Sequence, residues 1–157
     1  SVPPDFLAAL QEKQSFLLVA HIGLDGDHLG TMLALYQGLK ALGKDVDMYL
    51  PEEIPSAYSF LACLDEVLRQ MPERRYDALI TLECPNVKRL PKGFEMSRFS
   101  DFVFNFDHHP DNENYGQALW IDPDAAALGE LALDLLLALG APITSEIPTA
   151  LYTALVT

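Results

Sequence analysis

The sequence predicts an α/β domain built on a doubly wound, mainly parallel β-sheet flanked by helices. Short, almost wholly apolar runs, typical of strands buried on both faces, alternate with segments whose apolar residues recur at helical spacing. The 157 residues are 50% hydrophobic and 21% charged, which fits one ordinary domain with its own core. Strands that alternate with helices form right-handed βαβ units, and such sheets bind ligands beyond the carboxyl ends of their strands.

In the first half of the chain, Pro3 and Pro4 are placed to open a short helix, and a continuous apolar run then forms the first strand. Apolar residues at helical spacing predict a long helix that stops at Gly43. The elements expected here are the strands 15–20 and 46–50, the helix 28–42, and one or two short helices within 56–71.

In the second half, two further buried strands and a short edge strand are expected, followed by two helices. Asp122-Pro123-Asp124 is expected to cap the first of these helices, which ends at Gly140. Tyr36 and Trp120 are expected in or near the core. The expected elements are the strands 77–82, 102–106 and 118–121 and the helices 125–139 and 145–156.

The net charge of −13 argues against binding to long duplex nucleic acid, because such proteins usually present a basic surface to the phosphates. Acidic proteins still act on small phosphorylated substrates when bound cations reverse the local field. Cys63 and Cys84 form neither a C-x-x-C motif nor a disulfide framework, so we expect reduced thiols and a cytoplasmic location. No apolar stretch approaches the roughly 20 residues that span a bilayer, and no membrane association is expected.

Two of the apolar strands end abruptly in residues that bind metals. The first is followed by His21-Ile22-Gly23-Leu24-Asp25-Gly26-Asp27, and the fourth by Asp107-His108-His109-Pro110. Imidazole and carboxylate ligands together suit divalent ions such as manganese, and the two strand ends can converge on one site. Two ions close together can activate a water and clamp a phosphoryl oxygen. No P-loop is present, and the glycines of the first loop do not match the dinucleotide-binding fingerprint.

Some of these residues also have simpler interpretations. Asp27 stands where the N-cap of the following helix is expected, so its carboxylate could cap that helix instead of binding a metal. His28 is interpreted as a helix-start or site-rim side chain, and Arg89 either meets a substrate phosphate or is an ordinary surface arginine. Asp111, Asn112 and Asn114 are expected to shape a turn.

At these motifs the chain resembles the DHH phosphoesterase superfamily, which includes RecJ-like exonucleases and the smaller oligoribonuclease/pAp phosphatases (nanoRNases). The resemblance rests on His21-x-x-x-Asp25-Gly26-Asp27-x-x-Gly30-Thr31 and on Asp107-His108-His109. Leu82-Glu83-Cys84-Pro85, the trailing Arg89, and the Leu-Tyr-Thr-Ala stretch from Leu151 look most like the nanoRNase branch. The resemblance covers essentially the whole chain, residues 1–157, as the family's N-terminal catalytic domain.

The resemblance implies two divalent ions, typically Mn²⁺, with Mg²⁺ or Co²⁺ as substitutes. By analogy, His21 and Asp25 would bind one ion, and Asp27 and His108 the other. Asp107 and His109 would orient ligands or meet the substrate phosphate. Asp107 also counts among the metal ligands, and Asp107, His108 and His109 together form the catalytic set. His109 and Arg89 would contact the substrate, and a bridging water would be the nucleophile.

The sequence departs from the family pattern in three places. Glu83 stands where the family usually has an aspartate that bridges both ions; its extra methylene displaces the carboxylate unless the backbone compensates, so it is either a metal ligand or a supporting residue. His28 stands where the family often has a small residue. Thr157 ends the sequence where the family continues to another aspartate and to a C-terminal substrate-binding domain, so a fragment or an isolated catalytic domain is expected.

The function implied is hydrolysis of short oligonucleotides or nucleotide phosphate esters such as pAp by a water activated between two metal ions. A metal-binding domain that does not turn over alone is also consistent with the sequence. So is a pyrophosphatase or a cyclic-dinucleotide phosphodiesterase, because these members of the superfamily have the same kind of site. The sequence leaves open the preferred substrate, the cleavage polarity, the native metal and whether the chain forms a homodimer.

Overall fold

A five-stranded sheet in which every neighbouring pair is parallel forms the centre of the computed structural model, which describes residues 1–157. Its order is β2-β1-β3-β4-β5. The strands are β1 (Ser15–Ala20), β2 (Asp45–Tyr49), β3 (Ala78–Leu82), β4 (Val103–Asp107) and β5 (Ala118–Ile121). The predicted fold class is confirmed. Because β1, β3 and β4 are neighbours, their carboxyl ends meet at one edge of the sheet.

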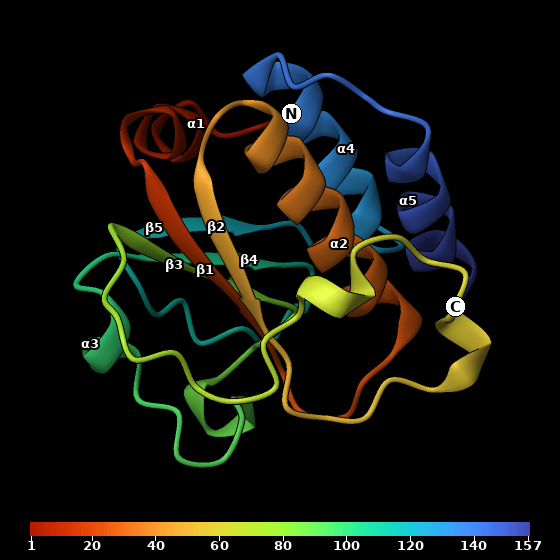
Figure 1. The fold of residues 1–157 in the computed structure, drawn as a ribbon. Coiled ribbons are helices and arrows are strands. Elements are labelled where there is room, and N and C mark those ends of the chain that lie inside the picture. The colour runs from red at the N-terminus through yellow and green to blue at the C-terminus, as the bar shows by residue number, and fades with distance from the viewer.

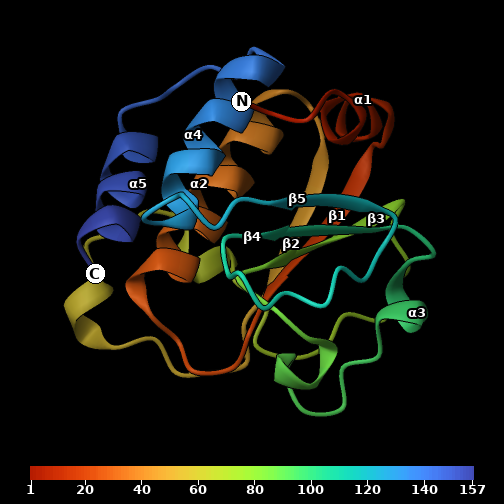
Figure 2. The same ribbon diagram turned by 180° about the vertical axis from the view of Figure 1, so that it is seen from behind.

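The long helices α2, α4 and α5 lie together on one side of the sheet (Figure 1), and α3 lies with long connections on the other side (Figure 2). The helices are α1 (Pro4–Glu12), α2 (Gly26–Ala41), α3 (Met96–Phe99), α4 (Leu128–Leu139) and α5 (Glu146–Val156), with short 3₁₀ helices η1 (Ser56–Tyr58), η2 (Leu64–Glu66) and η3 (Val87–Arg89). Strand β1 shows why both faces are apolar: Phe16 and Leu18 pack into the larger core, and Leu17 and Val19 into the smaller one. Tyr36 and Trp120 are buried, as predicted.

Several element boundaries differ from the prediction. Helix α4 begins at Leu128 rather than near residue 125, because the Asp122 side chain accepts a hydrogen bond from Asp124 N and forms a turn instead of a cap. The segment 56–71 contains η1 and η2, two short helices as expected, whereas α3 and η3 were not predicted. Strand β2 begins and ends one residue earlier than expected.

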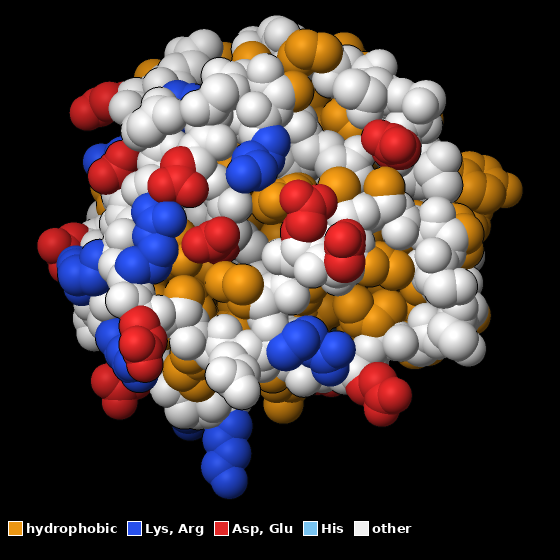
Figure 3. All heavy atoms as spheres, viewed as in Figure 1, with side chains coloured by type: hydrophobic (Ala, Val, Ile, Leu, Met, Phe, Trp, Pro, Cys, Tyr) orange, Lys and Arg blue, Asp and Glu red, His pale blue; other side chains and the backbone are white.

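Basic and acidic side chains are interspersed on the face shown in Figure 3. Two arginines form surface ion pairs: Arg74 with Asp45 at 2.9 Å and Arg75 with Asp101 at 2.9 Å. None of the helices combines the length and the apolar character that crossing a membrane requires.

Candidate metal centre

The loop after β1 carries the first group of candidate ligands. His21 follows the strand directly, and Asp25 is the N-cap of α2. Between them, Gly23 adopts a left-handed φ of 88°, and the amides of Gly23 and Leu24 both donate to Glu52 Oε2, at 3.0 and 3.3 Å. A carboxylate from the segment after β2 therefore fixes the path of this loop.

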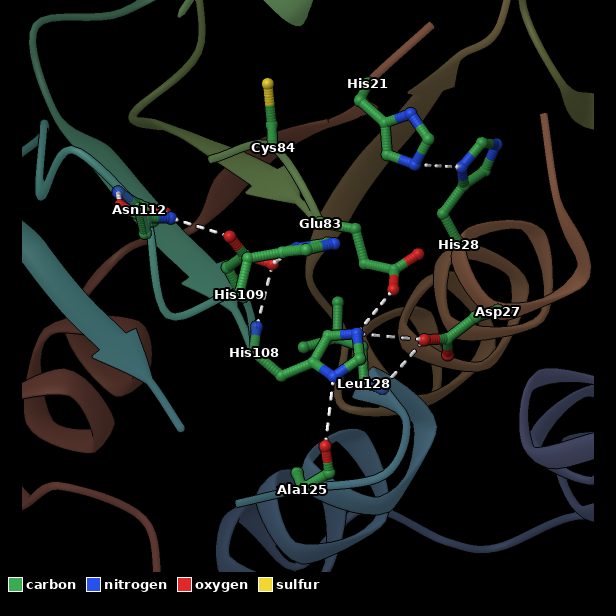
Figure 4. A network of polar contacts seen from close by, with 12 residues as sticks. His21, Asp27, His28, Glu83, Cys84, His108, His109, Asn112, Ala125 and Leu128 are labelled. Atoms are coloured by element: carbon green, nitrogen blue, oxygen red, sulfur yellow. Dashed lines mark hydrogen bonds and ion pairs between the residues drawn. The ribbon is translucent and has the colours of Figure 1, made fainter. Parts of the chain in front are cut away.

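His21, Asp25 and His28 come together at this end of the sheet. His21 Nε2 lies 3.2 Å from His28 Nδ1 (Figure 4) and 3.7 Å from Asp25 Oδ2. Burial opposes the Asp25 charge, but the nearby His21 ring and the hydrogen bond from the His28 amide lower the pKa of Asp25 to about 2. Burial alone would lower the pKa of His21, but the nearby Asp25 carboxylate and the hydrogen bond with Ile22 O give a net rise. Burial lowers the pKa of His28 to about 4, so this ring is neutral near pH 7.

Asp27 lies inside the first turn of α2, so the interpretation of Asp27 as the N-cap of its own helix is wrong. Its carboxylate instead reaches the start of α4, where it accepts hydrogen bonds from Leu128 N at 2.9 Å and Gly129 N at 3.2 Å. Helix α4 has no cap from its own N-cap residue, Ala127, so Asp27 satisfies these otherwise unpaired amides. Although burial opposes ionisation, these donors and His108 lower the pKa of Asp27.

Glu83 follows β3 and points toward His108 and Asp27 (Figure 4). Its φ of 52° is left-handed, a conformation that costs a residue other than glycine about 1–2 kcal/mol. The residue is 3% exposed, Oε1 lies 2.7 Å from His108 Nε2, and Oε2 has no hydrogen-bond partner. Burial raises the pKa of Glu83 to about 8, and the Asp27 carboxylate acts in the same direction.

His108 is held by contacts at both ring nitrogens (Figure 4). Nδ1 lies 3.0 Å from the carbonyl oxygen of Ala125, which can only accept, so Nδ1 carries the proton. Nε2 faces Glu83 Oε1 and, at 3.4 Å, Asp27 Oδ2. Hydrogen bonds with Asp27 and Glu83 raise the pKa of His108 to about 11, so a bound cation must displace a proton from Nε2.

Asp107 is fully buried at the end of β4 and accepts three hydrogen bonds. Its Oδ1 accepts from His108 N at 2.7 Å and lies 2.6 Å from His109 Nδ1, and its Oδ2 accepts from Asn112 Nδ2 at 2.8 Å. Asn112 is fixed in turn by reciprocal amide hydrogen bonds with Asn105 of 2.8 and 3.0 Å. The His109 side chain remains 39% exposed, so Asp107 orients an imidazole that solvent can reach.

Arg89, in η3, stands apart from this cluster. Its carbonyl oxygen accepts a hydrogen bond from Ile22 N at 2.7 Å, which ties η3 to the loop after β1. Its side chain is exposed and has no hydrogen bond or ion pair with any of the candidate ligands. A substrate contact by Arg89 stays a prediction.

The residues present fit divalent cations. Two sets each offer one ligand atom per residue, with the atoms of a set within 4.8 Å of one another: His21, Asp25, His28 and Glu83, and Asp27, Glu83 and His108. Glu83 belongs to both sets, and its unpartnered Oε2 is a buried carboxylate oxygen without a compensating donor. Buried carboxylates of this kind are normally paired or coordinated to metal. Asp107 falls in a third set, with His108 and His109.

Four residues contribute here in ways that the sequence did not predict. His28, interpreted from the sequence as a helix-start or rim residue, lies fully buried against His21. Asn112 does shape its turn by accepting from Asn114 N at 2.8 Å, and it also binds Asp107. The third and fourth are Asn105, inside β4, and Glu52. An asparagine within an apolar strand was the one signal that could have indicated a buried network.

Known proteins resemble this chain in sequence. The model of the DHH family, N-terminal domain, matches residues 15–155. The bifunctional oligoribonuclease and PAP phosphatase NrnA of Thermus thermophilus is 33% identical over 144 residues, which is 89% of this chain and 42% of that protein. The NrnA of Bacillus subtilis is 25% identical over 140 residues, or 85% and 41%. The chain therefore spans less than half the length of these curated relatives.

A solved structure supports the fold. An exopolyphosphatase-related protein from Bacteroides fragilis superposes with a TM-score of 0.84 at 21% identity, over 95% of this chain and 47% of that one. At this level of identity the likeness concerns the arrangement of strands and helices.

Proposed function

The chain belongs to the DHH family, and on this premise we propose that residues 1–157 form the catalytic domain of a metal-dependent phosphoesterase. The substrates proposed are short oligonucleotides, nucleotide phosphate esters such as pAp, or both. The activities for which the NrnA relatives are named support this substrate class, and the net charge of −13 favours substrates that need few phosphate contacts. The proposal includes a cytoplasmic location and is compatible with a homodimer.

The proposed centre holds two divalent ions, for which Mn²⁺ is the first candidate. His21 and Asp25 would hold one ion, Asp27 and His108 the other, and Glu83 would bridge them. When bound, such ions lower the pKa of a water and neutralise charge on a phosphoryl oxygen.

The chain's own residues prepare this site. The Ala125 carbonyl fixes the His108 tautomer and leaves Nε2 directed at the carboxylates. The amides at the start of α4 hold Asp27 in one orientation. Asp107 orients the His109 ring through Nδ1, so that its exposed edge would face a substrate phosphate or the leaving oxygen.

One observation carries this proposal: Glu83 Oε2 is a buried carboxylate oxygen without a partner, in a residue whose Oε1 lies 2.7 Å from His108 Nε2. Glu83 belongs to both candidate ligand sets, so its carboxylate would be within reach of both ions. No serine or threonine hydroxyl compensates it.

Manganese titration by calorimetry, with hydrolysis of pAp and of bis(p-nitrophenyl) phosphate followed in the same samples, tests the proposal. The second substrate needs few binding contacts, so it reports the centre itself. We expect two ions and hydrolysis in the wild-type chain. Glu83→Gln keeps the shape but removes the charge, so it should lose one ion and at least about 100-fold in turnover.

Arg89→Ala serves as the matched comparison. It should weaken the apparent affinity for pAp without changing ion stoichiometry, because no candidate ligand contacts its side chain. A wild-type chain that binds no divalent ion and hydrolyses neither substrate contradicts the proposal.

A further inference from the structure

His28 occupies a position that the family motif does not explain. Its side chain is fully buried in the first turn of α2, and the Asp25 carboxylate accepts a hydrogen bond from its amide at 2.9 Å. Its ring stands nearly perpendicular to that of His21, with the ring centroids 4.7 Å apart. Nε2 has no hydrogen-bond partner, so every polar contact of the ring is made through Nδ1.

We propose that His28 is a further ligand of the ion held by His21 and Asp25, bound through Nδ1. We also propose that this second imidazole shifts the site toward ions that favour nitrogen ligands, such as Co²⁺ and Zn²⁺. The inference rests on the proposed two-ion centre and specifies the chemistry of one of its two sites.

The distances around His28 Nδ1 fit a shared coordination sphere. Two ligands that each lie about 2.1 Å from one ion and are about 100° apart as seen from it are separated by about 3.2 Å. The His28 Nδ1 to His21 Nε2 distance is 3.2 Å, and the Asp25 carboxylate lies beside both rings, with Oδ1 3.6 Å from His28 Nδ1 and Oδ2 3.7 Å from His21 Nε2. The two imidazole nitrogens and one oxygen of the Asp25 carboxylate can therefore surround one ion without a large movement of the loop.

The hydrogen bonds of His21 also direct the lone pair of its Nε2 into the space between His21, His28 and Asp25. His21 Nδ1 contacts the carbonyl oxygen of Ile22, which can only accept, so His21 carries its proton there and presents the bare Nε2 toward His28. The Glu83 carboxylate lies below the two histidines in Figure 4, and its Oε2 is unpartnered. In the absence of an ion, His28 Nδ1 donates to this bare nitrogen, so a cation between these groups would move the His28 proton to the unpartnered Nε2 and would then be held by both imidazoles and the carboxylate.

The ligand set determines which ions are favoured. Carboxylates and water suit Mg²⁺ and Mn²⁺, whereas imidazoles suit Co²⁺, Ni²⁺ and Zn²⁺. These three ions also bind a given nitrogen site more tightly than Mn²⁺ does. With His21 alone, the site would offer one imidazole and otherwise carboxylates. With His21 and His28 together, it offers two imidazoles. We therefore expect a larger ratio of Co²⁺ to Mn²⁺ affinity than a single-histidine site gives.

Calorimetric titration of the chelator-treated chain with Co²⁺ and with Mn²⁺ tests the inference, together with the visible absorption of the Co²⁺ form. His28→Ala should weaken Co²⁺ binding at one site by at least about tenfold, weaken Mn²⁺ binding less, and change the Co²⁺ spectrum. His28→Asn replaces the ring with a shorter side chain that can offer oxygen, so it should retain more Mn²⁺ than Co²⁺ affinity. This second variant carries the test if the alanine variant does not fold, as judged by circular dichroism in EDTA.

His109→Ala is the matched control, because it also removes one imidazole but lies outside the His28 set. It should leave the affinity of this site and its selectivity unchanged. An unchanged Co²⁺ affinity and spectrum in both His28 variants overturns the inference, as does an equal loss for Co²⁺ and Mn²⁺, which indicates loosened packing. If the wild-type chain binds neither ion, the proposed function fails instead, so the two failures are distinguishable.

Discussion

At the residue scale, the contacts of Asp107 show how a buried carboxylate is kept in one orientation. Its Oδ2 has a single side-chain donor, Asn112, and Asn112 is itself fixed by two hydrogen bonds with Asn105. Asp107 Oδ1 then meets His109 Nδ1. These contacts run from inside β4 to a partly exposed imidazole, so a buried amide supports the orientation of that imidazole through Asp107.

We predict that Asn112→Ala lowers turnover by about tenfold to 100-fold and the free energy of unfolding by about 1–3 kcal/mol, because it leaves buried partners unsatisfied. Steady-state kinetics and urea unfolding measure the two effects. Asp111→Ala, at an exposed position in the same turn, is the control and should change neither. Equal behaviour of the two variants would show that Asp107 needs no support from Asn112.

Sequence alone could identify the candidate ligands but not the residues that support them. His21, Asp25, Asp27 and the Asp107-His108-His109 run stand out because polar residues end apolar strands. The pairing of Asp27 with α4 joins residues 101 and 102 positions apart, and no local pattern records such a contact. The roles of the ligands themselves stay predictions until ions are titrated.

A second residue-scale prediction concerns Asp77, which links the chain just before β1 to the start of β3. Its Oδ2 accepts from Gln14 N at 2.9 Å and Ser15 N at 3.1 Å, and these backbone donors lower the pKa of Asp77. Because the folded-state pKa lies below the unfolded value of 3.8, the stabilisation is present above pH 3.8 and is lost as the pH falls through the folded pKa.

The measurement is urea unfolding of the wild type and of Asp77→Asn between about pH 2 and pH 6. The wild type should be the more stable above the unfolded-state pKa, and the difference should shrink as Asp77 protonates, since the charged acceptor is then lost from both proteins. A stability difference that does not vary with pH contradicts this account of Asp77.

At the element scale, α2 and α5 pack closely because Gly30 has no side chain. A Cβ at Gly30 would lie 2.3 Å from the carbonyl oxygen of Ala150 and 3.1 Å from the Ala154 Cβ, both in α5. Gly38, two turns later, would meet the Leu136 Cδ2 of α4 at 2.3 Å, which is the end of a flexible side chain. The same substitution therefore meets a rigid neighbour at one position and a movable one at the other.

Gly30→Ala should lower the free energy of unfolding by about 1–3 kcal/mol or more, because backbone must shift to admit the methyl group. In Gly38→Ala the leucine can rotate, and the gain in helix propensity of about 1 kcal/mol offsets part of the cost. Thermal and urea unfolding compare the two variants. A loss at Gly38 equal to or larger than that at Gly30 would contradict the close backbone contact as the cause.

The presence of most helices and strands could be predicted from the sequence, whereas some of their first and last residues could not. Apolar runs and helical spacing identified all five strands and the helices α1, α2, α4 and α5. The predicted start of α4 is too early, because the Asp122 turn resembles a cap in sequence, while the amides of the helix are in fact satisfied by Asp27. The four-residue α3 and the 3₁₀ helix η3 are too short to show a period.

At the scale of the whole molecule, the sheet order gathers negative charge at one edge. Strands β1, β3 and β4 are neighbours, so the carboxylates of Asp25, Asp27 and Glu83 lie close together in a chain whose net charge is already −13. Unfolding separates these groups. Divalent ions that each need two of these carboxylates should consequently bind the folded chain in preference to the unfolded one.

The last prediction follows from this linkage. Saturating Mn²⁺ should raise the free energy of unfolding of the chelator-treated chain by about 2.7 kcal/mol at an ion concentration 100 times the dissociation constant. Differential scanning calorimetry in EDTA and at increasing Mn²⁺ measures the shift of the melting temperature.

Because divalent ions also screen the general negative charge, Glu83→Gln is the necessary control: its net charge is still −12 (−13 + 1), but it lacks the central carboxylate. An equal shift in both proteins would mean that screening, not a specific centre, stabilises the fold, whereas a shift largely confined to the wild type ties the stability of the sheet edge to the candidate metal centre.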